Sequence, residues 1–248
     1  MDEYTKARDL QVRKNEFDKL LWDAGDAFTK QLIRTNYVKN FTWMGIPILQ
    51  YPSDMFVMQE LIWEIKPNIM IETGMAFGGT AIFYSNILKE IWSHNELITI
   101  DIDMRVRNWE RLRSHTAAGR IITIEGDSAS ETVASEVREI VAKMERRIGA
   151  PPRVMVALDS HHTHDHVLKE LLLYSPMVSK DSYIVVFDTA IEFFMKKKPK
   201  DRPWCKGNNP YTAVMEFLSK HKDQFVIDKN VETRSYITAA IDGWLKKL

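Results

Sequence analysis

The sequence predicts an α/β protein with one mostly parallel β-sheet that ends in an antiparallel pair of strands. Short apolar runs alternate with helix-like stretches, which is the pattern of βαβ units. The runs at 153–158 and 182–187 are apolar almost throughout, as in strands buried on both faces. The last two runs, 224–228 and 235–240, lie too close together for a crossover connection, which needs about a dozen residues or more.

The remaining elements follow from hydrophobic periodicity. Residues 1–40 are predicted to be helical because apolar residues recur at three- and four-residue spacing, and Ser53 and Pro67 delimit a second helix at 53–65. The first five strands are expected at 68–72, 97–102, 121–125, 153–158 and 182–187. The helices between them are expected at 80–93, 105–118, 130–148 and 163–175. The biased stretch 196–210 is expected to be a long loop of the kind that often forms a lid.

A glycine-rich turn follows the first strand. The apolar run ends at Glu72 and Thr73, Gly74 follows, and Gly78, Gly79 and Thr80 open the next helix. Glycine permits positive φ and close approach of a ligand, and the helix N-terminus offers free N–H groups. The spacing E-x-G-x-x-x-G-G lacks the dinucleotide pattern G-x-G-x-x-G, and an acid before the first glycine suits a ligand with an amino group, such as S-adenosylmethionine (SAM). The alternative is a plain strand–turn–helix corner.

Acidic residues end or closely follow five successive strands. They are Glu72, Asp101, Asp127 with Ser128, Asp159, and Asp188 with Thr189. One such acid is usually a turn or cap residue, but five at the ligand-binding edge of a parallel sheet favour a site. Asp101 is suited to the ribose hydroxyls of an adenosine or to capping a helix. Asp127 and Ser128 are suited to contacting the adenine or to forming a solvated turn.

Asp159 and Asp188 are expected on adjacent strand ends, where two carboxylates suit Mg²⁺. The alternative is that hydrogen bonds or nearby basic residues hold both acids. Four histidines follow Asp159. His162 is a candidate general base, whereas His161 and His164 are expected to be exposed and His166 to pack structurally. The histidines indicate a zinc site only weakly, because Cys or Glu ligands at characteristic spacing are missing.

Composition excludes several classes of function. Lys plus Arg and Asp plus Glu number 34 each, so net charge gives no attraction to nucleic acid or to anionic membranes. The N-terminus lacks a signal-peptide core, and no apolar run approaches the ~20 residues that span a bilayer. The single cysteine, Cys205, cannot form an internal disulfide, which is consistent with a cytoplasmic protein.

These segments together resemble the cephalosporin hydroxylase and rhamnosyl O-methyltransferase family over roughly residues 40–248, and the sheet core is more loosely similar to catechol O-methyltransferase. The resemblance rests on Gly45–Gln50 with Pro52 and Asp54, Gln59-Glu60, Pro67–Thr80, Leu158-Asp159-Ser160, His162-Thr163, His166-Val167, Asp188-Thr189 and Gly243-Trp244-Leu245. It implies a Rossmann-like, seven-stranded class I methyltransferase domain over 53–248. The periodicity of the N-terminal helices, rather than the resemblance, leads us to expect a helical cap or oligomerisation segment over 1–52.

The resemblance also implies the roles of the site residues. SAM would be held by Glu72, Gly74, Asp101 and the turn at 126–128, and Mg²⁺ by Asp159 and Asp188. His162 stands where the catechol enzyme has a lysine base. The family commonly has Glu-Asp-Thr where this chain has Phe187-Asp188-Thr189, so either Asp159, Asp188 and Thr189 hold the ion or metal binding is weak or lost; we favour retained binding.

The predicted function is therefore Mg²⁺-assisted, SAM-dependent O-methylation of a hydroxyl on a sugar or secondary-metabolite scaffold. The rival hypotheses are a nicotinamide-dependent oxidoreductase and a non-catalytic member that binds SAM. The partner is expected to be a small molecule, with no nucleic acid and no membrane span. The apolar stripe of the N-terminal helix favours a homo-oligomer.

Overall fold

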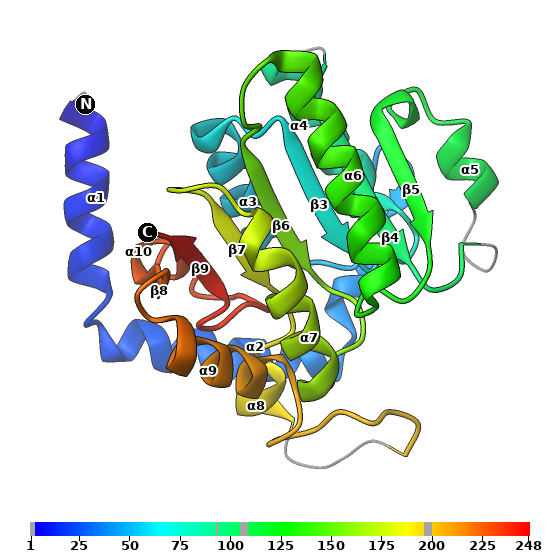
Figure 1. Ribbon diagram of the computed structural model, residues 1–248. Helices are drawn as coiled ribbons and strands as arrows, with labels where there is room; N and C mark the ends of the chain where they lie inside the picture. The colour runs from blue at the N-terminus through cyan, green and yellow to red at the C-terminus, as the bar shows by residue number, and fades with distance from the viewer. Residues whose placement is uncertain (1–2, 93, 105–108, 196–199) are drawn as a thin grey trace.

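The protein contains a seven-stranded sheet flanked by helices on both faces. The computed structural model describes residues 3–92, 94–104, 109–195 and 200–248 (Figure 1). The strand order is β5-β4-β3-β6-β7-β9-β8, and only the pairs that involve β9 are antiparallel. The strands are β3 (Ile69–Thr73), β4 (Glu96–Asp101), β5 (Ile121–Glu125), β6 (Val154–Leu158), β7 (Tyr183–Val186), β8 (Phe225–Ile227) and β9 (Trp244–Lys247). This arrangement confirms the predicted class I methyltransferase sheet.

The position of the last strand differs from the prediction. The strand expected at 235–240 is β9 at Trp244–Lys247, and residues 235–240 form an irregular segment instead. The N–H of Ala239 donates to the Asp54 carboxylate (2.8 Å), and its carbonyl accepts from Ala190 N (3.2 Å). Tyr236 has a left-handed φ of 52°. The segment has the amino-acid composition of a strand, but its backbone groups form hydrogen bonds with Asp54 and Ala190 rather than with a neighbouring strand.

Two hydrophobic layers enclose the sheet. One face packs against α3 (Pro52–Ile65) and α4 (Gly79–Ile91), and the other against α6 (Glu131–Ile148), α7 (His164–Tyr174) and α9 (Pro210–His221). Ser130 caps α6 by accepting from Val133 N, and Gly149 ends that helix at a φ of 72°.

Helix α9 was not expected from the sequence, and residues 200–209 of the predicted loop are irregular. Positions 196–199 lie outside the described residues.

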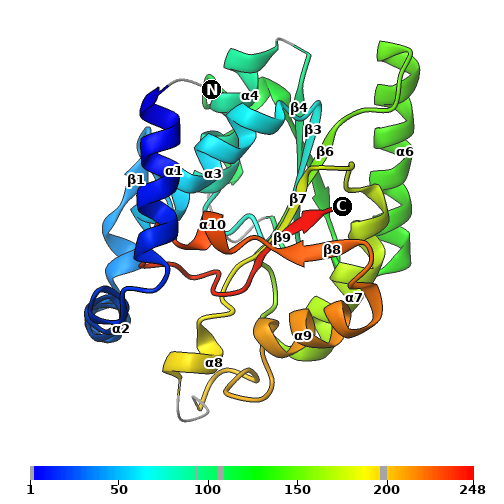
Figure 2. The same cartoon turned by 90° about the vertical axis from the view of Figure 1, so that its left-hand side faces the viewer.

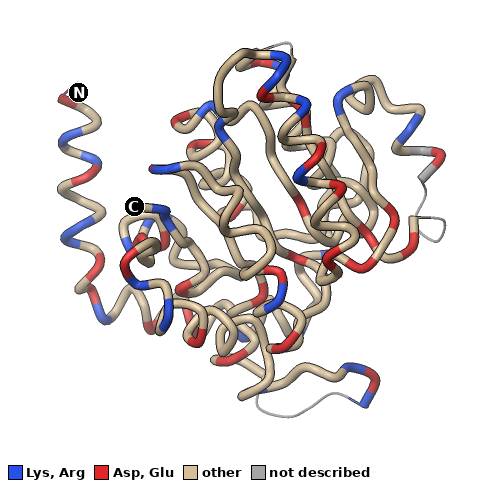
Figure 3. Tube along the Cα trace, viewed as in Figure 1, with Lys and Arg blue, Asp and Glu red and all other residues tan. Residues whose placement is uncertain are grey.

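The β4–β5 connection contains less helix than predicted. The expected helix at 105–118 is represented by α5 (Trp109–Arg113) and a 3₁₀ turn at Ala118–Arg120, and residues 105–108 lie outside the described part. Short helices α8 (Ile191–Phe194) and α10 (Lys229–Glu232) also follow β7 and β8. Acidic and basic residues are interspersed along the chain, in agreement with the balanced charge (Figure 3).

The N-terminal region is helical, as predicted, but it is divided. Its elements are α1 (Glu3–Asn15), α2 (Lys19–Arg34), a 3₁₀ turn at Tyr37–Asn40 and a small hairpin of β1 (Thr42–Trp43) and β2 (Ile46–Pro47). Helix α1 buries none of its residues; it stands beside the rest of the molecule in Figure 1 and lies in front of it in Figure 2. Within the described residues, no helix is both long enough and apolar enough to cross a membrane.

Side chains of α3 join it to the segment that precedes β9. The Asp54 carboxylate accepts from Ala239 N, Ser53 Oγ donates to the Ile237 carbonyl, and Glu60 pairs with Arg234 at 3.0 Å. We call these three contacts the α3 seam. They hold the irregular segment against the sheet edge that carries the site.

Candidate active site

The glycine turn after β3 lies directly against the end of β6. Thr73 is opposite Ile100 of β4 and Leu158 of β6, so the residues after these positions leave the sheet side by side. Gly74 has a φ of 85°, and a Cβ there would lie 2.0 Å from the Asp159 carbonyl oxygen. A side chain at this position is therefore excluded by both conformation and space.

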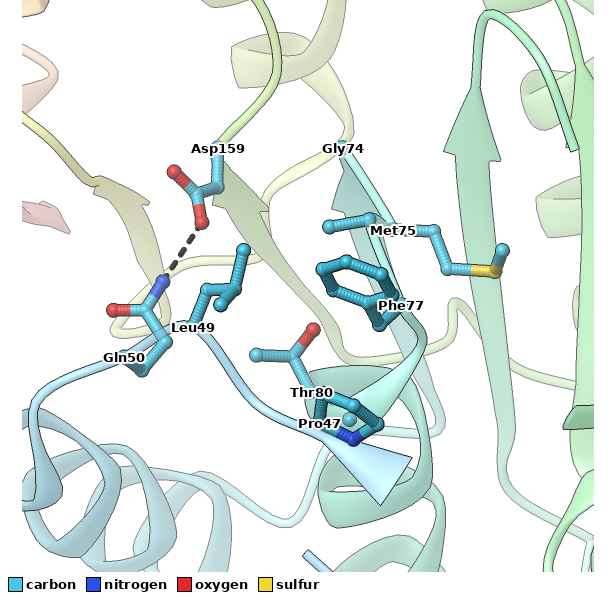
Figure 4. A pocket seen from close by; sticks show the side chains of 10 residues that line it. Pro47, Leu49, Gln50, Gly74, Met75, Phe77, Thr80 and Asp159 are labelled. Carbon is cyan, nitrogen blue, oxygen red and sulfur yellow. Dashed lines mark hydrogen bonds between the residues drawn. The ribbon is translucent and has the colours of Figure 1, made fainter. Parts of the chain in front are cut away.

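The Gly74 turn, Gly79, Pro47, Gln50 and Asp159 line a small cavity at the carboxyl edge of the sheet (Figure 4). Gly79 opens α4, and a Cβ on it would lie 2.3 Å from the Pro47 carbonyl oxygen. The end of β2 and Ile48 after it therefore pack against the start of α4. Gln50 Nε2 donates to Asp159 Oδ2 at 2.7 Å across this cavity.

Replacing Gly74 with alanine is expected to weaken SAM binding at least about tenfold, because the turn must shift away from β6 to admit the methyl group. Isothermal titration with SAM measures this effect, and Gly119→Ala is the matched control because nothing lies within 4 Å of a Cβ there. Equal SAM affinity in the two variants would contradict the prediction.

Glu72 lies beneath the turn and is 3% exposed. It accepts a hydrogen bond from Thr99 Oγ1 at 2.6 Å. Burial raises the pKa of Glu72 to about 7, although hydrogen bonds from Thr80 and Thr99 oppose the shift and the nearby charge of Asp101 adds to it. The hydroxyl of neighbouring Thr73 is buried with no partner among the described residues. Both side chains supply polar groups at the floor of the predicted SAM site.

The outer acids make contacts within their own turns. Asp101 accepts from Ala76 N at 3.1 Å and from Asp103 N at 3.3 Å, and the exposed Asp127 accepts from Ala129 N at 2.9 Å. Ser128 is buried, with Oγ 3.1 Å from His166 Nε2. These contacts are those of the alternative hypothesis, turns and caps. The roles of Asp101, Asp127 and Ser128 in binding adenosine stay predictions.

Asp159, His162 and Asp188 converge at the same edge. One ligand atom from each residue lies within 4.8 Å of the other two, and His162 Nε2 is 3.1 Å from Asp188 Oδ2. Burial, followed by the charges of Asp188 and Glu72, raises the pKa of Asp159 well above its ordinary value. A divalent cation would relieve this repulsion, and two carboxylate oxygens are donors that Mg²⁺ prefers. The residues therefore fit a hard cation that keeps several waters.

The two residues that flank Asp188 point away from this centre. Phe187 is 1% exposed and packs edge-on against Trp244, with ring centroids 6.1 Å apart. Thr189 is fully buried, and its Oγ1 donates to the Ala239 carbonyl at 3.3 Å. Asp188 itself has a φ of 59°, a left-handed conformation that aspartate tolerates better than most residues. The role of Thr189 as a ligand stays a prediction.

The other histidines have separate roles. His161 is exposed as expected, and His166 packs as expected, with Nε2 3.0 Å from Ser160 Oγ. The prediction that His164 is exposed is wrong, because its ring lies between Thr212 Oγ1 (2.8 Å) and Glu216 Oε2 (3.2 Å) of α9. The sequence pattern did not predict α9, so it gave no signal for this contact.

Gln50 was missed as a site residue. It lies 109 positions before Asp159, and the only sequence signal was its place in the Gly45–Gln50 motif. The ring of Trp204 lies edge-on to His162, with centroids 4.9 Å apart, and so walls the histidine on the side of the 200–209 segment.

Comparison with known proteins assigns the family. The profile of the rhamnosyl O-methyltransferase/CmcI family matches residues 35–248. This chain belongs to that family. The rhamnosyl O-methyltransferase of Mycobacterium leprae (strain TN) is 28% identical over 213 residues, which cover 85% of each chain. That of Mycobacterium tuberculosis (strain ATCC 25618 / H37Rv) is 26% identical over 206 residues, or 82% of this chain and 77% of the relative.

Solved structures show the same fold. The complex described as cmcI-D160 Mg-SAM superposes with a TM-score of 0.60 at 17% identity, covering 85% of this chain and 77% of that one. As a member of the rhamnosyl O-methyltransferase/CmcI family, the chain is a SAM-dependent O-methyltransferase with a small-molecule substrate. These comparisons give no support to a nicotinamide-dependent oxidoreductase. The resemblance inferred from the sequence motifs is thereby confirmed.

Proposed function

We propose that this methyltransferase acts on a sugar hydroxyl, with a divalent cation between Asp159 and Asp188 and with His162 as the base. The observation that carries the proposal is the convergence of these three side chains, within 4.8 Å, beside the Gly74 turn. The curated relatives are named for rhamnosyl acceptors, which supports a deoxyhexose glycoside as the substrate class.

When bound, SAM supplies an electrophilic methyl group and Mg²⁺ supplies positive charge that stabilises an oxyanion. His162 would take the proton of the acceptor hydroxyl at Nδ1, because Nε2, which lies 3.1 Å from Asp188 Oδ2, would carry the hydrogen that it donates to that carboxylate. Asp188 would orient this ring, and the resulting imidazolium would be stabilised by the same carboxylate. Gln50 would hold Asp159 by donating to Oδ2, which leaves the other carboxylate oxygen free.

The Gly74 turn and Gln50 would also restrict the position of the two substrates. They line one cavity with Asp159, so a donor against the turn and an acceptor near Asp159 would lie in contact (Figure 4). Holding two reactants in line is a large part of the rate enhancement in bimolecular transfer. Trp204 would limit water around His162, since its ring covers that histidine.

Replacing His162 with glutamine is expected to lower kcat by about 10²-fold, the contribution of a positioned general base. The expected loss is in proton transfer, so affinity for Mg²⁺, measured by isothermal titration, should change less than about threefold if Asp159 and Asp188 supply the carboxylate ligands. His161→Gln is the matched control, because that histidine is exposed and one position away.

A loss of Mg²⁺ affinity equal to the loss of kcat would contradict the base assignment and make His162 the third ligand. The pH dependence of kcat separates the two roles further. A general base gives an ascending limb that the glutamine variant loses.

Methyl transfer from tritiated SAM to methyl α-rhamnoside, with and without EDTA, tests the proposed function directly. We expect transfer that EDTA abolishes and Mg²⁺ restores. SAM binding without transfer to any glycoside would instead favour the non-catalytic hypothesis.

We further propose that residues 1–52 form a cap that mediates homo-oligomerisation. Support comes from apolar side chains that this region leaves in solvent, with Phe17 and Leu20 both 82% exposed and Leu10 57% exposed. Large apolar side chains left in solvent on one region of a chain often mark an interface. Light scattering should show a multimer, and the double variant Phe17→Ser/Leu20→Ser should give a particle of lower mass than the wild type. The cytoplasmic location stays a prediction.

A further inference from the structure

A second cavity lies between α2, α8 and the segment that precedes β9. Its volume is about 150 Å³, and its walls include Trp22 and Asp26 of α2, Phe193 of α8, and Glu232 and Tyr236. Helices α2 and α8 both lie below the sheet in Figure 1, where the parallel strands end. We call this cavity the α2–α8 pocket.

The pocket adjoins the metal-binding edge through one short stretch of chain. Helix α8 begins at Ile191, three residues after Asp188, and Phe193 lies in it. Thr189 and Ala190 lie between Asp188 and Ile191, and both donate to the Ala239 carbonyl. These two hydrogen bonds hold the chain that leads into α8 against the segment before β9, which forms another wall of the pocket. Five residues in compact conformation span on the order of 10 Å, so the distance between the two places is comparable to the length of a disaccharide.

Two conformationally costly residues build the pocket. Tyr236 has a φ of 52°, which is a rare conformation for a bulky residue and recurs at functional sites. Gly25 lies inside α2, where glycine is less favourable than alanine, and a Cβ there would lie 3.0 Å from the Tyr236 carbonyl oxygen. Gly25 thus permits α2 to approach Tyr236, whose ring meets Trp22 edge-on with centroids 5.3 Å apart.

The chemistry of the walls selects a class of ligand. Aromatic rings offer flat apolar surface, and the exposed Asp26 carboxylate can accept hydrogen bonds from hydroxyl groups. The Glu232 carboxylate is buried and already accepts from Lys229 Nζ and from Asp242 N. A pyranose ring has both an apolar C–H face and a rim of hydroxyl donors. Asp26 and Glu232 disfavour an anionic ligand, although Lys229 partly compensates Glu232 at 3.2 Å and Lys30 Nζ lies 5.9 Å from the ring centroid of Phe194, which also lines the pocket.

We propose that the α2–α8 pocket binds a neutral sugar ring joined to the ring that accepts the methyl group. This inference rests on the proposed function and makes its substrate an oligosaccharide rather than a single sugar. The pocket would raise affinity for the longer substrate and orient its terminal hydroxyl toward His162.

The test compares methyl α-rhamnoside with the methyl glycoside of a rhamnosyl disaccharide. We expect kcat/KM for the disaccharide to be at least tenfold higher, and a disaccharide with a uronic acid as its inner ring to lose most of that gain. Phe193→Ala should lower the disaccharide-to-monosaccharide ratio at least fivefold. That side chain is 44% exposed, so the fold should tolerate its loss. Trp22→Ala should act in the same direction.

Trp63→Ala is the matched control, because Trp63 is a 52% exposed aromatic residue on α3 that does not line the pocket. An unchanged ratio in both pocket variants, or equal use of the uronic acid disaccharide, would overturn the inference. Saturation-transfer NMR with the neutral disaccharide reports binding without turnover. If SAM binds but no sugar is methylated, the proposed function fails. The pocket is then tested by the NMR signal of the inner ring: a signal seen with the wild type and lost in Phe193→Ala supports the pocket, whereas an equal signal in both proteins refutes it.

Discussion

Replacing Asp159 with asparagine should lower kcat for methyl transfer by about 10³-fold or more, since the lost charge stabilisation at a metal site is worth several kcal/mol. The variant removes one negative oxygen from the group formed with His162 and Asp188 but keeps the shape of the side chain. Affinity for SAM, measured by isothermal titration, should stay within about threefold, because Glu72 and the Gly74 turn are intact.

Asp165→Asn serves as the matched control for this experiment, because Asp165 is an exposed acid at the start of α7. Wild type with EDTA should reproduce the Asp159→Asn phenotype. Full turnover of the variant in the presence of EDTA would reject the metal role while leaving SAM-dependent transfer intact.

Replacing Asp54 with asparagine should remove a large pH dependence of stability. Burial raises the pKa of Asp54 from 3.8 to about 7 in the folded protein, although the Ala239 N–H and Thr238 oppose the shift. The folded state therefore holds a proton that the unfolded state releases. Its stabilising effect is complete below the unfolded pKa and is lost as pH rises to about 7.

The loss is at most about 4 kcal/mol, since each unit of pKa difference corresponds to about 1.4 kcal/mol. Asparagine resembles the protonated acid and still accepts from Ala239 N, so the variant should be the more stable protein at pH 8. Urea denaturation of both proteins at pH 5 and pH 8 measures the difference. Glu72 contributes a slope of the same sign to both, and parallel pH profiles would contradict the prediction.

The sheet was predictable because its strands are buried on both faces and therefore carry uninterrupted apolar runs. The same regularity made the edge predictable: once β3, β6 and β7 are parallel neighbours, Asp159 and Asp188 must leave the sheet together. The convergence of His162 on Asp188 then follows from its place three residues after Asp159.

Long-range side-chain contacts were not predictable from local patterns. The 235–240 segment has the composition of a strand, but Asp54 and the 189–190 turn take its backbone groups. The bond between Gln50 and Asp159 likewise depends on how the hairpin segment returns to the sheet. In both cases the deciding partner is more than 45 residues distant, beyond any helical or strand period.

The α3 seam bears on the kinetics of folding. The Asp54–Ala239 contact joins residues 185 positions apart, so forming it closes a long loop at a cost in chain entropy. We expect this polar contact, which contributes no hydrophobic burial of its own, to form after the rate-limiting step. Substitutions in the seam should therefore accelerate unfolding in a chevron experiment and leave the refolding arm almost unchanged.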